Sequence, residues 1–221
     1  SVDQMAATLG LLVEVGPLPG DRVMSLSCSG GEASLVADTA ARHGVGFAEF
    51  APSQSARLQA TLSDLVTISN PLDYHTFIWG DESRLTDCFT AALDGTADVA
   101  LLVLDWPTSG DSSSWYPTLR AIAAAHEATN TPTIVAATLA ENMPAVAQEQ
   151  LGRDGITVAH SIDGAFASIA AAAYAGRHLA QPAPRLHRPP AQPRHATDTL
   201  SEADAKRLLA DAGVDVPPSQ R

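Results

Sequence analysis

Two kinds of segment alternate regularly along this chain of 221 residues, and the alternation leaves few possible folds. Short apolar runs with many β-branched residues lie at 23–27, 46–50, 99–105, 133–138 and 156–159. Amphipathic stretches with helical spacing surround them, at 2–13, 31–43, 53–62, 82–93, 113–128, 143–151 and 163–179. Because the run 99–104 is apolar at every position, we expect a central strand there, buried on both faces. The pattern predicts an α/β fold with helices on both faces of a parallel sheet.

Charge and cysteine content exclude several classes of protein. The chain has 13 Lys and Arg against 25 Asp and Glu, a net charge of -12 that would repel a nucleic-acid backbone. Its apolar runs are far shorter than the roughly 20 residues that cross a bilayer, so we expect no membrane contact. The two cysteines, Cys28 and Cys88, have no CxxC spacing, which argues against a disulfide framework or a zinc site and suits the cytoplasm.

Five strands joined by right-handed crossovers favour a flavodoxin-like sheet of order 2-1-3-4-5. The strand order then reverses between the first and third strands. Three unusual segments should meet at that point: 27–31 after the first strand, 105–110 after the third strand, and 70–75. Open α/β sheets bind ligands beyond the carboxyl ends of their strands at such a reversal, so we expect the functional site there.

The turn Ser29-Gly30-Gly31 leads directly from the first strand into a helix. Its glycines let backbone N–H groups converge, and the helix dipole favours an anion at that end. The alternative is that the two glycines only make a tight turn, and the sequence leaves both interpretations open. Glu32 in the first helical turn would compete for the same dipole or orient a cationic partner.

Several sharper motifs are absent or incomplete. The chain has no G-x-G-x-x-G dinucleotide motif, no phosphate-binding Walker loop, and no complete G-x-S-x-G elbow around Ser29. Cys28 could act as a nucleophile with His75, although a small residue packed in a turn is the favoured interpretation. Asn70 and Pro71 predict a turn, and we expect Phe77 and Trp79 to pack against the sheet.

The C-terminal part has a different composition. Residues 181–199 are rich in proline and predict a stiff linker. Residues 200–213 predict a helix with Ser201 as its N-cap and Asp204 three residues later. Since a lone helix cannot build a core, we expect the start of a further domain there, and the first residues suggest an excised piece of a longer protein.

Four segments together resemble one family, the NDP-forming acyl-CoA synthetases, which include ADP-forming acetate–CoA ligases and are related to succinyl-CoA synthetase. These segments are SGGEASLVAD (29–38), NPLDYHTFIWG (70–80), ADVALLVL (97–104) and LSEADAKRLL (200–209). The resemblance implies a flavodoxin-like CoA-ligase domain over 1–180, the linker 181–199, and the start of an ATP-grasp domain over 200–221.

In that family, acid, CoA and ATP are converted to acyl-CoA through an acyl phosphate and a phosphohistidine. The resemblance implies that Ser29, Gly30 and Gly31 donate to the phosphoryl group, with Glu32, Asn70 and Asp73 as possible supporting residues. No catalytic residue is expected in this chain, because Tyr74-His75-Thr76-Phe77 does not match the small-residue string around the phosphohistidine, which should lie upstream.

The resemblance also implies partners and cofactors. The partners would be the CoA-binding Rossmann, phosphohistidine and ATP-grasp domains of the same enzyme, in a homo-oligomer in the cytoplasm. ATP or ADP, CoA and Mg would serve the complete enzyme, with none of them bound by this chain alone.

Two other functions stay open at this stage. The chain could be a degenerate, ligand-sensing copy of this module in a regulatory protein acetyltransferase. A response-regulator-like domain ranks last. Such a domain needs a cluster of acidic residues, and only Asp105 of that cluster is present.

Overall fold

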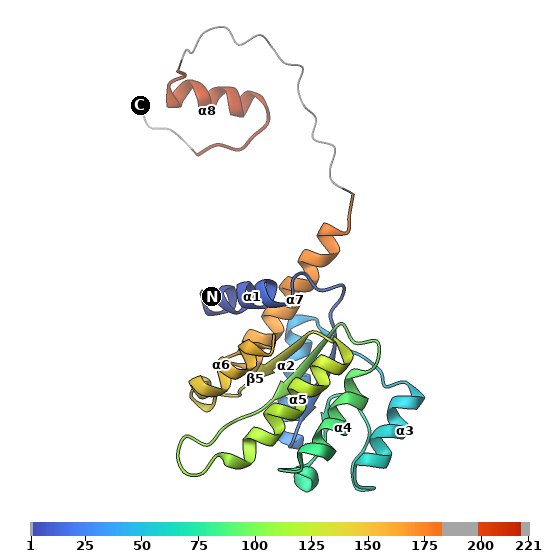
Figure 1. Ribbon diagram of the computed structural model, residues 1–221. Helices are drawn as coiled ribbons and strands as arrows, with labels where there is room; N and C mark the ends of the chain where they lie inside the picture. Colours follow the sequence, from blue (N-terminus) through green and yellow to red (C-terminus); the bar gives the residue numbers. More distant parts are fainter. Residues whose placement is uncertain (1, 183–198, 218–221) are drawn as a thin grey trace. The chain divides into compact units, whose positions relative to one another are not determined.

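A six-stranded parallel sheet forms the centre of this computed structural model (Figure 1). The strand order is β2-β1-β4-β5-β6, with the short strand β3 also paired to β1. The bounds are β1 Arg22–Ser27, β2 Gly46–Phe47, β3 Leu72–Asp73, β4 Val99–Val103, β5 Thr133–Ala136 and β6 Thr157–Ala159. Without β3, this order is the predicted 2-1-3-4-5, so the predicted α/β fold class is confirmed. The sequence did not predict β3, which has only two residues.

The structure describes residues 2–182 and 199–217. The chain divides into two compact units, Ser1–Pro182 and Ala183–Arg221, and each is described by itself. In the second unit, α8 (Glu202–Asp211) begins at the predicted N-cap, where the Ser201 hydroxyl accepts a hydrogen bond from the Asp204 backbone N–H. The predicted linker lies almost wholly outside the described residues.

Helices cover both faces of the sheet, as Figure 1 shows. One layer consists of α3 (Pro52–Thr61), α4 (Glu82–Leu93), α5 (Tyr116–Thr129) and α6 (Ala145–Arg153). The other consists of α1 (Val2–Glu14), α2 (Gly30–His43) and α7 (Ile162–Leu179). Three short 3-10 helices, η1 (Thr76–Ile78), η2 (Ser113–Trp115) and η3 (Ala140–Asn142), lie in the connections. Helix α6 begins two residues later than predicted because Pro144 is its N-cap.

The side chains of β4 alternate between two apolar clusters, one on each face of the sheet. Ala100 and Leu102 belong to the cluster with α3–α6, whereas Val99, Leu101 and Val103 belong to the cluster with α1, α2 and α7. All five side chains are fully buried, which confirms the prediction of a central strand.

One edge of β1 is completed by a side chain. Along this edge β2 pairs with Arg22 and Val23, and β3 pairs with Leu26 and Ser27. Between them, the Asn70 amide group donates to the Val23 carbonyl at 2.8 Å and accepts from the Ser25 N–H at 3.0 Å. The same amide donates to the Ala48 carbonyl at 2.8 Å. The second strand is therefore shorter than the predicted 46–50, because the Asn70 amide forms hydrogen bonds with β1 where a longer strand would.

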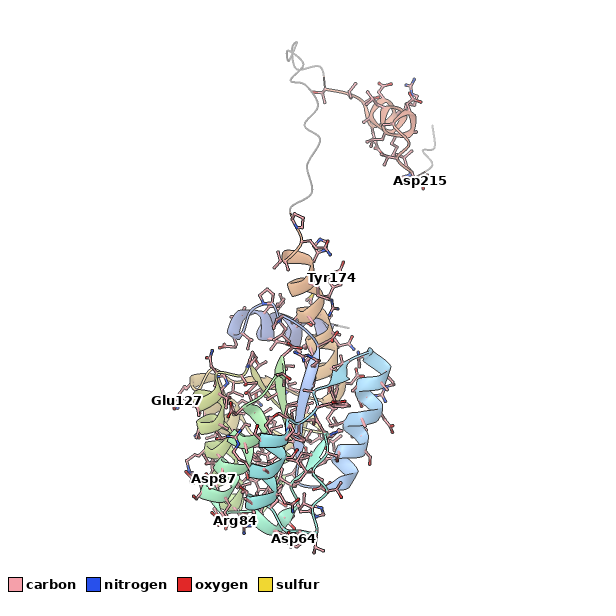
Figure 2. All side chains as sticks on the ribbon, turned by 90° about the vertical axis from the view of Figure 1, so that its right-hand side faces the viewer. Asp64, Arg84, Asp87, Glu127, Tyr174 and Asp215 are labelled. Carbon is pink, nitrogen blue, oxygen red and sulfur yellow. The ribbon has the colours of Figure 1, made fainter. Side chains whose placement is uncertain are left out.

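Polar surface residues cover the outer side of the α3–α6 layer. Figure 2 shows Arg84 and Asp87 on α4 and Glu127 on α5, all exposed. Within the described residues, no helix has both the length and the apolar character that crossing a membrane requires.

Candidate functional site

The three segments predicted to converge do meet beyond the carboxyl ends of β1 and β4. Cys28 of 27–31 and Asp105 of 105–110 line one pocket of about 440 Å³, together with Glu32 and Thr76, which directly follow 27–31 and 70–75. An added Cβ at Gly30 would lie 3.4 Å from the Asp73 carboxylate, so the strand β3 end also borders the turn. The position of the site thus agrees with the point where the strand order reverses.

The turn at Ser29-Gly30-Gly31 presents the N-terminus of the 14-residue helix α2. Ser29 is the N-cap, and its hydroxyl accepts from the Glu32 N–H at 3.2 Å, which leaves the hydroxyl proton available for donation. Within the part of the chain that the structure describes, the N–H groups of Gly30 and Gly31 have no hydrogen-bond acceptor. Both glycines are exposed. The turn therefore has the geometry of an anion-accepting helix end.

The two glycines also leave free space in front of the turn. A Cβ added at Gly31 would meet only the Ser29 hydroxyl oxygen, at 3.7 Å. Both glycines have negative φ, so the turn itself does not require them. What they provide is close access to the backbone for a ligand.

Acidic side chains surround this helix end. Burial, followed by the nearby charges of Asp105 and Asp73, raises the pKa of Glu32 to about 7. Near neutral pH, Glu32 is therefore present in both its neutral and its ionised form. An anion at Gly30 and Gly31 meets less repulsion when Glu32 is neutral.

Cys28 is held in its thiol form. Its Sγ lies 3.9 Å from Glu32 Oε2, and burial together with the charges of Glu32 and Asp73 raises its pKa to about 12. Since only the thiolate is a good nucleophile, the geometry supports the favoured interpretation of Cys28 as a packed residue in the turn.

Asp73 orders the loop that follows β3. Its carboxylate accepts from the His75 N–H at 2.9 Å and lies 3.6 Å from His75 Nε2. His75 has a positive φ of 56°, which is uncommon for a residue with a side chain. The next residue back, Tyr74, is fully buried and packs edge-on against Phe89 at 5.2 Å.

Two tryptophans form one wall of the pocket beside the turn. The rings of Trp79 and Trp115 pack edge to face, with centroids 5.2 Å apart and an angle of 81°. The Trp115 indole N–H donates to the Asp105 carbonyl at 2.6 Å, which fixes the orientation of that ring. Cys28 and Leu104 complete the lining, so the pocket combines an aromatic side with an acidic side.

The sequence predicted the packing of these aromatic residues only in part. Trp79 packs against the core as predicted, but the same prediction for Phe77 is wrong, because Phe77 is 54% exposed and stacks on His75. Thr76 and Trp115 were not predicted at the site. Trp115 lies at the start of a long amphipathic segment, and nothing local indicated that its ring meets Trp79.

Asp105 joins β4 to the segment after β5. Its two carboxylate oxygens accept from the Thr138 N–H and hydroxyl, at 2.9 and 2.7 Å, and from the Asn142 side-chain amide at 3.2 Å. A phosphoacceptor aspartate needs a free oxygen to attack phosphorus, so these contacts weigh against a response-regulator-like role for Asp105. Among the described residues, no three His, Cys, Asp or Glu side chains are grouped so as to hold a metal ion.

Comparisons with known proteins bear on the fold. Protein-family models give no match, and neither do curated protein sequences. Among solved structures, the crystal structure of PH0766 from Pyrococcus horikoshii OT3 matches with a TM-score of 0.69 and 19% identity over 82% of this chain. The dinucleotide-forming acetyl-coenzyme A synthetase 1 of Ca. Korarchaeum cryptofilum matches with a TM-score of 0.66 and 18% identity over 80% of this chain. That match is the same for the apo form and the complex with phosphate and ADP.

The chain spans only part of these relatives, 41% of PH0766 and 38% of the Korarchaeum synthetase. The resemblance to acyl-CoA synthetases that the sequence suggested is thus confirmed at the level of the fold. The chain has the fold of a segment of a dinucleotide-forming acetyl-coenzyme A synthetase.

Proposed function

We propose that this chain is the flavodoxin-like CoA-ligase domain of an NDP-forming acyl-CoA synthetase. In the complete enzyme it would present the turn Ser29-Gly30-Gly31 to a phosphoryl group carried on a histidine of another domain. The observation that carries the proposal is the exposed N-terminus of α2, with two N–H groups that have no acceptor in the described structure. One of the similar structures holds phosphate and ADP, which fits an enzyme of this class.

The turn would act by positioning and by charge stabilisation. A phosphoryl group in transfer carries negative charge on its equatorial oxygens, and fixed N–H donors stabilise that charge without supplying a nucleophile. Ser29 would add its hydroxyl proton, and a neutral Glu32 would keep the acidic surroundings from opposing the anion. CoA, ATP and Mg would bind to the other domains, and we assign none of them to residues of this chain.

The second unit, the complete enzyme and the support of the turn are also part of the proposed function. We infer that the helix α8 begins an ATP-grasp domain, that the enzyme acts in the cytoplasm as a homo-oligomer, and that Asn70 and Asp73 support the turn from β3. The bonds from Asn70 to β1 and from Asp73 to His75 support this last role.

The test is the Gly31→Val variant of the complete synthetase. A valine side chain finds space within the chain, because the nearest atom to a Cβ is 3.7 Å away, yet it would occupy the approach of the phosphoryl group. Losing such a donor site costs about 3 kcal/mol, or roughly a hundredfold in turnover. Acyl-CoA formation and steady-state labelling of the phosphohistidine are the two measurements.

Gly152→Val is the matched control, because a Cβ at Gly152 of α6 meets nothing within 4 Å and so also fits without a clash. A folded Gly31→Val enzyme that turns over like the control would remove the turn from the mechanism. An unaltered complete protein that binds ligands but forms neither phosphohistidine nor acyl-CoA would instead favour the ligand-sensing alternative.

A further inference from the structure

The pocket beside the turn has a size and lining that nothing in the phosphoryl-binding role requires. Its volume of about 440 Å³ is typical of small-molecule sites, and its lining includes Glu32, in the same helical turn as Gly30 and Gly31. Acetate has only four non-hydrogen atoms and would leave most of this space to water. The pocket therefore suits a larger group attached to something bound at the turn.

The aromatic wall is rigid before any ligand arrives. Trp79 and Trp115 hold each other edge to face, and the Trp115 N–H is already bonded to the Asp105 carbonyl. Trp79 and Trp115 are partly exposed and line the pocket, whereas Leu104 is 2% exposed and offers a ligand little surface. The indole rings favour a flat apolar group, which can pack against them with little loss of side-chain entropy.

The polar side of the pocket excludes a second negative charge. In the described part of the chain, none of the seven lining residues is Lys or Arg, and two of them are the carboxyl groups of Glu32 and Asp105. The Asp105 oxygens already accept from Thr138 and Asn142, so this carboxyl group offers a ligand no hydrogen-bond donor. A dicarboxylic acid would place its second carboxylate against these groups without a counter-charge.

We propose that this pocket receives the side group of the acid substrate, and that Trp79 and Trp115 select a monocarboxylic acid with an uncharged, planar side group over acetate or a dicarboxylic acid. The inference rests on the proposed function, because the carboxyl end of the acid would lie toward the Gly30 and Gly31 N–H groups. The side group would then lie against the two indole rings.

The experiment uses the 221-residue chain and three probes: trans-cinnamate, acetate and succinate. The chain has three tryptophans, and the third, Trp106, is 3% exposed in the core and does not line the pocket. In NMR spectra, cinnamate should shift the indole N–H signals of Trp79 and Trp115 and leave that of Trp106 in place. Its affinity from calorimetry should exceed those of acetate and succinate by at least tenfold.

Variants test the role of the wall. Trp79→Ala should weaken cinnamate binding about tenfold, and Trp79→Phe should recover part of the loss. Phe77→Ala is the matched control, since Phe77 is an exposed aromatic of the same loop outside the pocket lining and its loss should change affinity less than twofold. Circular dichroism checks that each variant folds.

The outcomes separate this inference from the proposed function. Equal affinity for the three acids, no binding of any, or equal effects of Trp79→Ala and Phe77→Ala would overturn the inference. Inorganic phosphate, which should shift the Gly30 and Gly31 amide signals, tests the turn independently. If cinnamate binds as expected but phosphate shifts neither glycine, the pocket preference holds and its assignment to a synthetase substrate falls.

Discussion

Glu32 has the most consequential environment of any single residue near the site. It lies half-buried in the first turn of α2, with Asp105 and Asp73 near it and the Cys28 thiol 3.9 Å away. Because its pKa rises from 4.5 to about 7, the folded chain keeps this proton over a range in which the unfolded chain has lost it. Its contribution to stability therefore decreases as pH rises from about 4.5 to 7 and is constant above that range.

The same proton should control anion binding at the turn. We expect the affinity of the chain for sulfate, which keeps its charge of -2 throughout, to fall about tenfold between pH 6 and pH 8 as Glu32 ionises. Calorimetry at the two pH values measures this change. Glu32→Gln should bind sulfate with nearly the same affinity at both.

Since an imidazole can also take up a proton in this pH range, His75→Gln serves as the control. It should retain most of the pH dependence. A pH dependence that survives in Glu32→Gln and disappears in His75→Gln would assign the effect to the histidine instead.

Helix α7 packs directly against the backbone of a loop. Where it passes the segment between α1 and β1, the Leu18 N–H donates to the Ala172 carbonyl at 3.2 Å. One turn further, a Cβ on Gly176 would lie 1.9 Å from the Leu18 carbonyl oxygen. The glycine is therefore needed for contact between helix and loop, although it lowers the helix propensity of α7.

Gly176→Ala should accordingly destabilise the fold. The clash with a backbone atom can be relieved only by moving α7 or the loop, and we expect a loss of about 1–3 kcal/mol in the free energy of unfolding by urea. Gly152→Ala in α6, where nothing lies within 4 Å, should be neutral or stabilising by up to about 1 kcal/mol. Equal effects of the two substitutions would show that the Leu18 contact does not constrain the helix.

A second link between elements depends on one buried amide. The Gln54 side chain accepts from the Ala51 N–H at the start of α3 and donates to the Ala91 and Ala92 carbonyls near the end of α4. It thereby satisfies groups at two helix ends that would otherwise lack partners. This contact fixes α3 against α4 on the face of the sheet that carries the site loops.

At the scale of the whole first unit, the sheet separates two apolar clusters that share its strands. The cluster on the α3–α6 side contains Trp106, with Trp79 and Trp115 packed against it. The cluster on the other side, around Phe166 of α7, contains no tryptophan among the residues that the structure describes. Since β1, β4 and β5 contribute side chains to both, the two faces should unfold together.

Phe166→Leu tests this cooperativity. Although no tryptophan lies in its cluster, the substitution should shift the urea midpoint seen by tryptophan fluorescence, with a loss of roughly 1 kcal/mol or more. Tyr174→Ser on the same helix (labelled in Figure 2) is the control, because Tyr174 is 64% exposed and its loss should move the midpoint little. An unchanged midpoint in Phe166→Leu, together with amide exchange that accelerates only in α1, α2 and α7, would mean that the faces unfold separately.

The sequence alone determined the features that depend on short-range patterns. Apolar periodicity located the α-helices of the first unit and its strands other than β3, and the buried run 99–104 marked the central strand. Serine before a helix marked the cap at Ser201, because a cap is made within three residues of itself. The convergence of the three site segments followed from strand order, which few topologies satisfy.

Only the tertiary structure decided the features made by residues far apart in the chain. The Asn70 amide completes the edge of β1 because the chain returns there some 45 residues later. The contact of Trp115 with Trp79 likewise joins two separate segments. The pKa of Glu32 depends on burial and on Asp105, which no local pattern specifies. Phe77 illustrates the reason: an apolar residue in a loop packs or stays exposed according to which surfaces the fold places beside it, and that placement is a property of the whole packed unit.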